Sequence, residues 1–344
     1  MSIGFLPPFQ NKESLYSYLA NLYLKSGYLS ARQFIDDIFV GQGAIDKDFY
    51  NVFNRTFFAQ LCETFSWEYI ILQHTSFKYF TRFISNKQRK KAWAEALKNG
   101  PRIRKYIIFP RNYNSKNERK LKYCPCCCID NTLPYYSISH QYKESKICPV
   151  CGCYLEETSV RSDSAHLGVF HPLVGEQRST SLKMALDDNI EYQLAKYIDK
   201  VNDCELVLNC KATIGEYLTY KLRGTKYLMG IRGGKKDVET MYRDIAAFYK
   251  GLKTNPLTLA HLKFIFEDKM NNPYEICMIA MFLKISPNEL ANYGKKTLTS
   301  LSSIVDKKIV SLYKSGKRIY EIANILKCPR ETVRKVILKS TNNN

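Results

Sequence analysis

The chain has 344 residues, of which 45% are hydrophobic and 13% aromatic, a content that supports packed cores and excludes an intrinsically disordered chain. A formal net charge of +20 indicates a polyanionic partner, nucleic acid first and an anionic membrane surface second. The sequence has no run of eighteen apolar residues and no charged N-terminal segment followed by an apolar one. We therefore expect neither a membrane span nor a secretory signal.

The first hundred residues predict a helical lobe. Prolines extend the opening Phe5-Leu6-Pro7-Pro8-Phe9. Asn11 is then placed to cap a helix with Glu13 in its first turn, and Ser26-Gly27 ends that helix. Helical spacing of apolar residues predicts further helices over residues 31–39, 50–64, 67–72 and 90–98.

The basic residues are concentrated in two segments. Residues 81–122 hold fourteen Lys and Arg against two acids, and residues 301–344 hold ten against three. A solvated basic face is the simpler explanation, but the two segments flank or contain the motifs described below, which favours contact with nucleic acid. In the first segment we expect phosphate contacts from Lys87, Arg89, Lys90 and Lys91.

Two cysteine knuckles, Cys124-Pro125-Cys126-Cys127 and Cys148-Pro149-Val150-Cys151, are separated by twenty residues. This spacing is typical of a structural zinc site, because each knuckle lets two thiolates converge on one cation. The expected ligands are Cys124, Cys127, Cys148 and Cys151, which leave no open coordination position for catalysis. The strand-like stretch 133–140 between the knuckles predicts a ribbon with a short hairpin.

Three further cysteines leave the ligand register open, because Cys126, Cys128 and Cys153 could each replace a ligand in a shifted register. His140 is an alternative ligand. Four cysteines already satisfy zinc, so we expect His140 to pack against the ribbon or to form a hydrogen bond. Seven of the twelve cysteines fall within residues 124–153, which favours a metal in a reducing compartment, the cytoplasm, over disulfides.

Residues 161–185 have the composition of a linker, and a second helical region follows. Asp237 is placed to cap a helix after a basic glycine-rich loop that matches neither a P-loop nor a dinucleotide-binding motif. We expect this loop to touch the nucleic-acid backbone through Arg232, Lys235 and Lys236. Apolar spacing predicts helices over residues 186–201, 214–222, 238–249 and 276–283, and another that begins at Ser286-Pro287.

The last fifty residues have the pattern of a helix-turn-helix, with helices predicted over residues 304–312, 319–326 and 330–339. Ala323 stands where two helices cross closely, and the expected core is Ile322, Leu326, Cys328, Val333 and Val336. The third helix would present polar and basic side chains to a major groove, namely Arg330, Glu331, Thr332, Arg334 and Lys335. Protein-docking modules can have the same form, but the basic charge favours DNA.

These features together resemble the TnsD/TniQ family, whose members choose insertion sites for certain bacterial transposons. Residues 5–9 and 13–19 resemble the opening signature of that family. Residues 123–127, His140-Gln141 and residues 148–152 resemble the zinc module of the family. The family commonly has histidine at the position of Cys151. Two shorter stretches resemble the longer, TnsD-type members, namely residues 74–77 and 272–276.

The resemblance implies a non-enzymatic role. TnsD-type members bind a double-stranded DNA attachment site and recruit an AAA+ ATPase regulator of transposition, whereas TniQ-type members dock onto an RNA-guided CRISPR surveillance complex. The second helical region and the helix-turn-helix pattern favour the TnsD type. The aromatic residues Tyr16, Tyr18 and Tyr23 are candidates for the ATPase contact, with burial in the core of the lobe as the alternative.

A nuclease or transposase with acidic metal ligands is the enzymatic alternative. It is disfavoured because the acid pairs are adjacent in sequence and so do not share a helix face. We therefore expect a mainly α, multidomain protein that contacts DNA at several places as a monomer. The predicted domains are a helical N-terminal TniQ-like lobe (1–119), a zinc-binding module (120–160), a TnsD-like helical domain (161–294) and a C-terminal helix-turn-helix (295–344).

Overall fold

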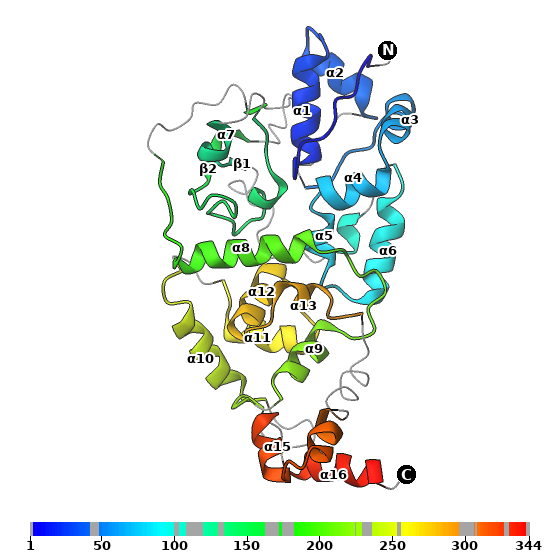
Figure 1. Cartoon of the computed structure of the whole chain (residues 1–344). Coiled ribbons are helices and arrows are strands. Elements are labelled where there is room, and N and C mark those ends of the chain that lie inside the picture. Colours follow the sequence, from blue (N-terminus) through cyan, green and yellow to red (C-terminus); the bar gives the residue numbers. More distant parts are fainter. Residues whose placement is uncertain are drawn as a thin grey trace. The chain divides into compact units, whose positions relative to one another are not determined.

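The computed structural model shows a mainly helical, multi-helical chain, which confirms the predicted fold class (Figure 1). It divides into two compact units, one made of Met1–Leu206 with Asn272–Cys277 and the other of Val207–Asn271 with Met278–Asn344. The four-domain division drawn from the sequence has other boundaries than these units and remains a prediction. The structure describes residues 3–41, 48–99, 103–107, 120–129, 134–161, 172–173, 182–223, 225–228, 236–252, 256–295, 306, 308–326 and 330–341.

The N-terminal lobe is built from helices, most of which the apolar spacing predicted, although α5 was missed and the starts of α3 and α6 differ by four or five residues. Its first helix begins after Ser14, whose side chain accepts a hydrogen bond from the Ser17 amide, so the prediction of Asn11 as the cap was wrong. Lys12 has a left-handed backbone (φ 57°), which turns the chain before the helix can begin. The helices are α1 (Leu15–Lys25), α2 (Ala31–Ile38), α3 (Arg55–Thr64), α4 (Trp67–His74), α5 (Phe77–Thr81) and α6 (Asn86–Ala96).

Aromatic side chains form much of the core of this lobe. The rings of Tyr50 and Trp67 meet edge to face with centroids 4.7 Å apart, and both side chains donate hydrogen bonds to the Ala96 carbonyl at the end of α6. Tyr16 and Tyr18 are each only 1% exposed. Of the two roles that the sequence left open for these tyrosines, burial in the core of the lobe is therefore confirmed, and a partner surface is excluded.

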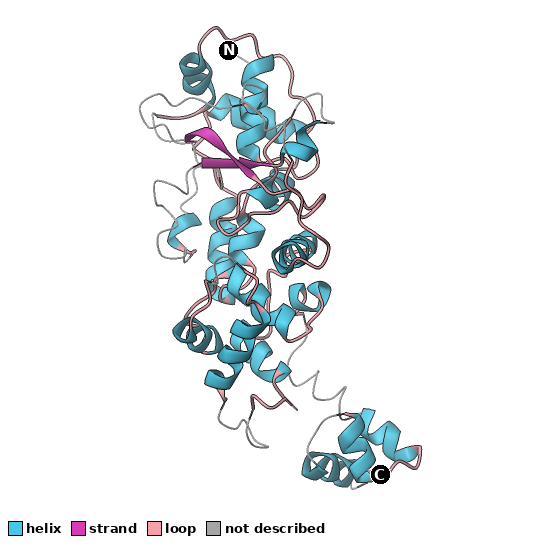
Figure 2. Ribbon diagram, turned by 90° about the vertical axis from the view of Figure 1, so that its left-hand side faces the viewer, coloured by secondary structure: helices cyan, strands magenta, loops and turns pink. Residues whose placement is uncertain are grey.

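The cysteine-rich segment contains two antiparallel strands, β1 (Lys120–Tyr123) and β2 (Glu156–Arg161), which cross in Figure 2. The strands flank the two knuckles, and the predicted hairpin between the knuckles was wrong. Residues 138–140 there form a short 3-10 helix, η3 (Ile138–His140). The first knuckle continues into a one-turn helix, α7 (Pro125–Ile129). Helix α8 (Ile190–Asp203) also belongs to this unit, and its Asp199 and Asp203 each form an ion pair with Lys12, at 2.8 and 2.7 Å.

The second unit begins with a close contact between two helices. Gly215 lies in α9 (Ile214–Lys221), and a Cβ at this position would lie 2.8 Å from the Phe266 carbonyl oxygen of α11 (Leu259–Phe266). Only glycine permits that approach. The sequence pattern missed α11 but predicted its neighbours, which are α10 (Val238–Phe248), α12 (Pro273–Phe282, shared with the first unit) and α13 (Pro287–Ala291).

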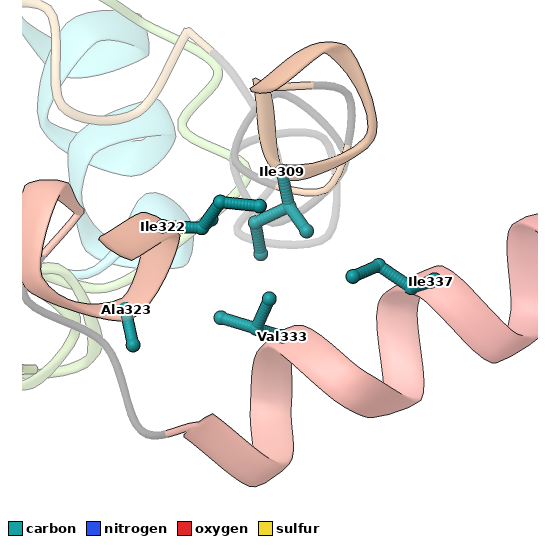
Figure 3. Packing of buried hydrophobic residues seen from close by; sticks show 5 residues of the cluster. All are labelled: Ile309, Ile322, Ala323, Val333 and Ile337. Atoms are coloured by element: carbon teal, nitrogen blue, oxygen red, sulfur yellow. The ribbon is translucent and has the colours of Figure 1, made fainter. Parts of the chain in front are cut away.

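Three C-terminal helices pack around a small apolar core: residues 308–314, α15 (Ile319–Ile325) and α16 (Arg330–Thr341). Figure 3 shows the buried side chains of this C-terminal cluster pointing toward one another from all three helices. Leu326 and Val336 are only partly buried, and Cys328 lies outside the described residues. The fully buried residues are Ile309, Ile322, Ala323, Val333 and Ile337, so the sequence missed the first and the last.

Candidate metal centre and basic surfaces

Four cysteine sulfurs converge in the first unit, all within 4.8 Å of one another. The Sγ atoms of Cys124 and Cys151 are 3.3 Å apart, and the Cys127 sulfur lies 3.7 Å from those of both Cys148 and Cys151. Four thiolates at about 2.3 Å from one zinc ion would have sulfurs about 3.8 Å apart. The cluster therefore has the size and the donor set of a closed, four-coordinate site for a thiophilic metal such as zinc.

Local backbone geometry positions each pair of cysteines. In the first knuckle the Cys127 amide points at the Cys124 sulfur, at 3.4 Å, because the chain turns directly into α7. The second knuckle closes through a hydrogen bond from the Gly152 amide to the Cys148 carbonyl, at 3.0 Å. Gly152 adopts a φ of +78°, a conformation that glycine adopts without steric cost. Both pairs are thus held by bonds within their own turns.

Neighbouring groups shift the pKa values of Cys148 and Cys124 in opposite directions. Hydrogen bonds from Cys124 and Cys127, and after them His140, lower the pKa of Cys148 well below its usual range. Hydrogen bonds to Cys127 and Cys148 raise the pKa of Cys124 above it. The Cys148 thiolate can therefore bind a cation first, and the bound cation then displaces the protons from the other thiols.

His140 and the neighbouring cysteines take supporting places. His140 is buried and lies outside the four-sulfur group, in agreement with the expectation that the four cysteines take precedence over it. Cys128 and Cys153 are buried and lie outside the four-sulfur group, as does the half-buried Cys126. Among the described residues, the group of potential metal ligands is therefore the register expected from the two C-P-x-C motifs.

The basic helix α6 divides its charges between solvent and core. Lys87, Lys90 and Lys91 are exposed and share one face of the helix. Arg89 is 0% exposed, so the expectation that it contacts phosphate was wrong. Its guanidinium donates hydrogen bonds to three carbonyls at and just after the C-terminal end of α5, those of Thr81 (2.9 Å), Arg82 (2.6 Å) and Ile84 (2.8 Å).

A signal for this burial was present in the sequence. Arg89 shares its helical face with Ala92 and Ala96, both of which are 0% exposed. Arg82 behaves similarly, because it is 2% exposed and donates to the carbonyls of Cys204 and Glu205 at the end of α8, at 2.8 and 3.0 Å. Cations are stabilised at helix C-termini, where carbonyl groups lack partners within the helix. Part of the basic segment is therefore structural.

The ends of the glycine-rich loop are joined in the second unit. Leu228 and Lys236 form an antiparallel bridge, and the Asp237 amide donates to the Tyr227 carbonyl at 2.9 Å. Lys236 places its ammonium 5.0 Å from the ring centroid of Phe266. Arg232 and Lys235 lie outside the described residues.

Helix α16 has one face in the C-terminal cluster and one in solvent. Val333 and Ile337 are buried in the cluster, whereas Arg330, Arg334 and Lys335 are exposed. Thr332 is half-buried at the margin. Lys335 forms an ion pair with Glu331 at 3.1 Å, which offsets part of its charge. The solvent face of α16 therefore presents two arginines one turn apart.

Comparison with known families identifies the N-terminal part of the chain. Residues 5–155 match the TniQ family model. This match confirms the resemblance to the TnsD/TniQ family over that part of the chain: the chain carries a TniQ domain, which associates it with transposition. No curated protein matches the chain at a significant level. Over the part of the chain that is described, no helix has the length and apolar character needed to cross a membrane.

Proposed function

We propose that this protein is a non-enzymatic target-site selector that binds a DNA attachment site and recruits an AAA+ ATPase regulator of transposition. The observation that carries the proposal is the solvent face of α16, which presents Arg330 and Arg334 from a C-terminal cluster in a chain with a TniQ domain. A helix supported by two others is the arrangement with which helix-turn-helix proteins enter a major groove. The protein would act at the bacterial nucleoid.

The two kinds of basic residue have different roles in this proposal. Arg330, Thr332, Arg334 and Lys335 would reach base edges, because a bidentate arginine can distinguish guanine from the other bases. Exposed lysines elsewhere would contact phosphates, which give affinity without sequence information. The exposed lysines are Lys87, Lys90 and Lys91 on α6; the half-buried Lys236 would join them, and the sequence adds Arg232 and Lys235.

The cysteine cluster would hold one structural zinc ion through Cys124, Cys127, Cys148 and Cys151. When bound, such an ion contributes folding free energy and performs no chemistry, since all four coordination positions are filled by protein. Its role would be to fix the two knuckles and the strands β1 and β2 that flank them.

Sequence-specific binding is tested with a duplex that the purified protein selects from a random library. Arg334→Ala should weaken binding to that duplex by about 1–3 kcal/mol and leave binding to random DNA nearly unchanged. Lys308→Ala, an exposed basic position on another helix of the same cluster, is the matched control. Equal losses on selected and random DNA for Arg334→Ala would show that α16 contacts only the backbone.

An adaptor between an RNA-guided CRISPR complex and the transposition machinery is the second candidate, because the match to the TniQ family alone suits both roles. The selector should bind duplex DNA without guide RNA and protect an asymmetric footprint of two or more turns, about 10 base pairs each. Binding that requires the RNA-guided complex would favour the adaptor. A short palindromic footprint from a dimer would contradict the monomeric, distributed contact.

The surface that meets the ATPase is proposed to lie on the N-terminal lobe. With Tyr16 and Tyr18 buried, the exposed apolar candidates near the end of α1 are Leu24 (46%) and Leu29 (100%). Leu24→Asp with Leu29→Asp should reduce capture of the ATPase and leave DNA binding intact. If the variant captures the ATPase as well as the wild type does, Leu24 and Leu29 do not form the contact.

A further inference from the structure

A backbone pairing joins the start of the chain to the metal-binding segment. Glu13 and Ser137 form an antiparallel bridge. The Ser14 amide donates to the Tyr136 carbonyl, and the Ile138 amide donates to the Lys12 carbonyl, both at 2.9 Å. Tyr136 is 0% exposed and Ser14 is 1% exposed, so these bonds lie in the interior. Buried backbone groups need such partners, because an unpaired one costs free energy comparable to a lost hydrogen bond.

Glu13 ties this pairing to the helices of the lobe. Its carboxylate is 2% exposed and accepts hydrogen bonds from the Asn21 amide group (3.0 Å), the Ser17 hydroxyl (3.3 Å) and the Gln10 backbone amide (3.0 Å). Its backbone carbonyl accepts a bond of 2.7 Å from Nδ1 of His74, the last residue of α4. One residue therefore connects α1, α4 and the paired segment.

Gln141 makes the corresponding connection toward the metal centre. Its side-chain amide donates to the Ser137 carbonyl (3.0 Å) and to the Lys122 carbonyl (2.7 Å), and its side-chain oxygen accepts from the Lys122 amide (3.1 Å). Lys122 lies in β1, two residues before the ligand Cys124. The strand that leads into the first knuckle is thus bonded to the segment that pairs with Glu13.

We propose that residues 136–141 form a latch that transmits the occupancy of the cysteine cluster to the N-terminal helices, with Glu13 and Gln141 as its positioning residues. The proposal rests on the metal site proposed above. Metal binding provides much of the folding free energy of a small cysteine-rich segment, and the latch extends that stabilisation to α1 and α4. Loss of the metal would loosen β1 and η3, and the paired segment 12–14 would lose its partner.

The latch has a consequence for recruitment. The lobe that carries the proposed ATPase contact would keep its shape only while the cysteine cluster holds its ion. The metal centre would then control a protein surface without touching the partner. The residues of the opening signature that resemble the TnsD/TniQ family, Glu13, Ser14 and Ser17 among them, would serve this coupling and not the partner directly, since all three are buried.

Hydrogen exchange of the full-length protein, followed by mass spectrometry before and after metal removal with a chelator, tests the latch. Metal removal should accelerate exchange of the α1 amides by about ten-fold or more in the wild type. Gln141→Ala should still bind about one metal ion per chain, but its α1 amides should exchange at one rate with and without the ion. Asn202→Ala is the matched control, because it removes a buried hydrogen bond within α8, away from the latch, and should respond as the wild type does.

Two results would overturn the latch. In the first, chelation accelerates exchange only within residues 145–155 and leaves α1 unchanged in the wild type. In the second, Gln141→Ala shows the full response of the wild type. A failure of the metal site itself is recognised separately, since elemental analysis would then find no metal in the wild type, and the latch would fall with it.

Discussion

The N-terminal lobe and the C-terminal cluster use arginine in opposite ways. In the lobe, Arg82 and Arg89 are buried and hydrogen-bonded to backbone carbonyls that follow helices. In the C-terminal cluster, Arg330 and Arg334 stand exposed on α16 while smaller apolar residues fill the core. A count of basic residues therefore does not measure a basic surface. The fold decides which of them can meet a polyanion.

The largest effect should come from the metal centre of the first unit, because its four thiols hold the cysteine-rich segment together only when a metal ion is bound. Cys148→Ser should lower the metal content from about one ion per chain to near zero, because a hydroxyl is a poor ligand for zinc. The loss should remove several kcal/mol of stability from the first unit, on the scale of about 10–16 kcal/mol measured for zinc in small fingers. Elemental analysis and thermal unfolding measure the two effects. Cys126→Ser, a neighbour outside the four-sulfur group, should keep the metal.

Arg89→Leu tests whether the buried arginines are structural. Removal of the guanidinium leaves three buried carbonyls without that donor, and the expected cost is about 3 kcal/mol of unfolding free energy. The adjacent Lys90→Ala removes an exposed charge and should change stability by less than about 0.5 kcal/mol. Chemical denaturation of both variants makes the comparison. Equal stabilities would contradict the capping role of Arg89.

His74 should make the lobe sensitive to acid. Burial, and after it the nearby Lys78, lowers the pKa of His74 to about 4, against 6.5 in the unfolded chain. Between these values the unfolded chain binds a proton that the folded chain does not. Stability should therefore be complete above about pH 6.5 and fall toward pH 4, by about 3 kcal/mol in total. Unfolding measured across this range should show a smaller slope in His74→Gln, and an unchanged slope would contradict the assignment.

The smallest effect is expected for the exposed lysines of α6, which contrast with the buried Arg89 of the same helix. Lys87→Ala, Lys90→Ala and Lys91→Ala together should weaken binding to selected and random DNA alike. The slope of log affinity against log salt concentration should become shallower by about 0.9 for each phosphate that the variant no longer neutralises. Stability should stay near that of the wild type, because all three side chains are exposed. An unchanged salt slope would remove α6 from the DNA-binding surface.

Short-range pattern was sufficient for much of this protein. The spacing of the two C-P-x-C motifs predicted which four sulfurs converge, because a knuckle is a local turn whose geometry depends on a few adjacent residues. Asp237 and Ser286 were likewise predicted at helix starts, since a cap bonds amides within its own first turn. The core of the C-terminal cluster followed from helical spacing at Ile322 and Val333.

Tertiary structure decided what depends on partners distant in sequence. The stretch 133–140 has strand-like composition, but residues 136–138 pair with residues 12–14 and continue into η3. The described residues between the knuckles, 134–147, therefore form no hairpin with one another. Arg89 lies in a basic run, yet its guanidinium is buried because it donates hydrogen bonds to carbonyls at the C-terminal end of α5. By itself the sequence determined the turns of the two knuckles, most of the helices and the cysteine register, because these depend on neighbouring residues. Which polar groups are buried was decided by the packing of distant segments, since each must find its hydrogen-bond partners there.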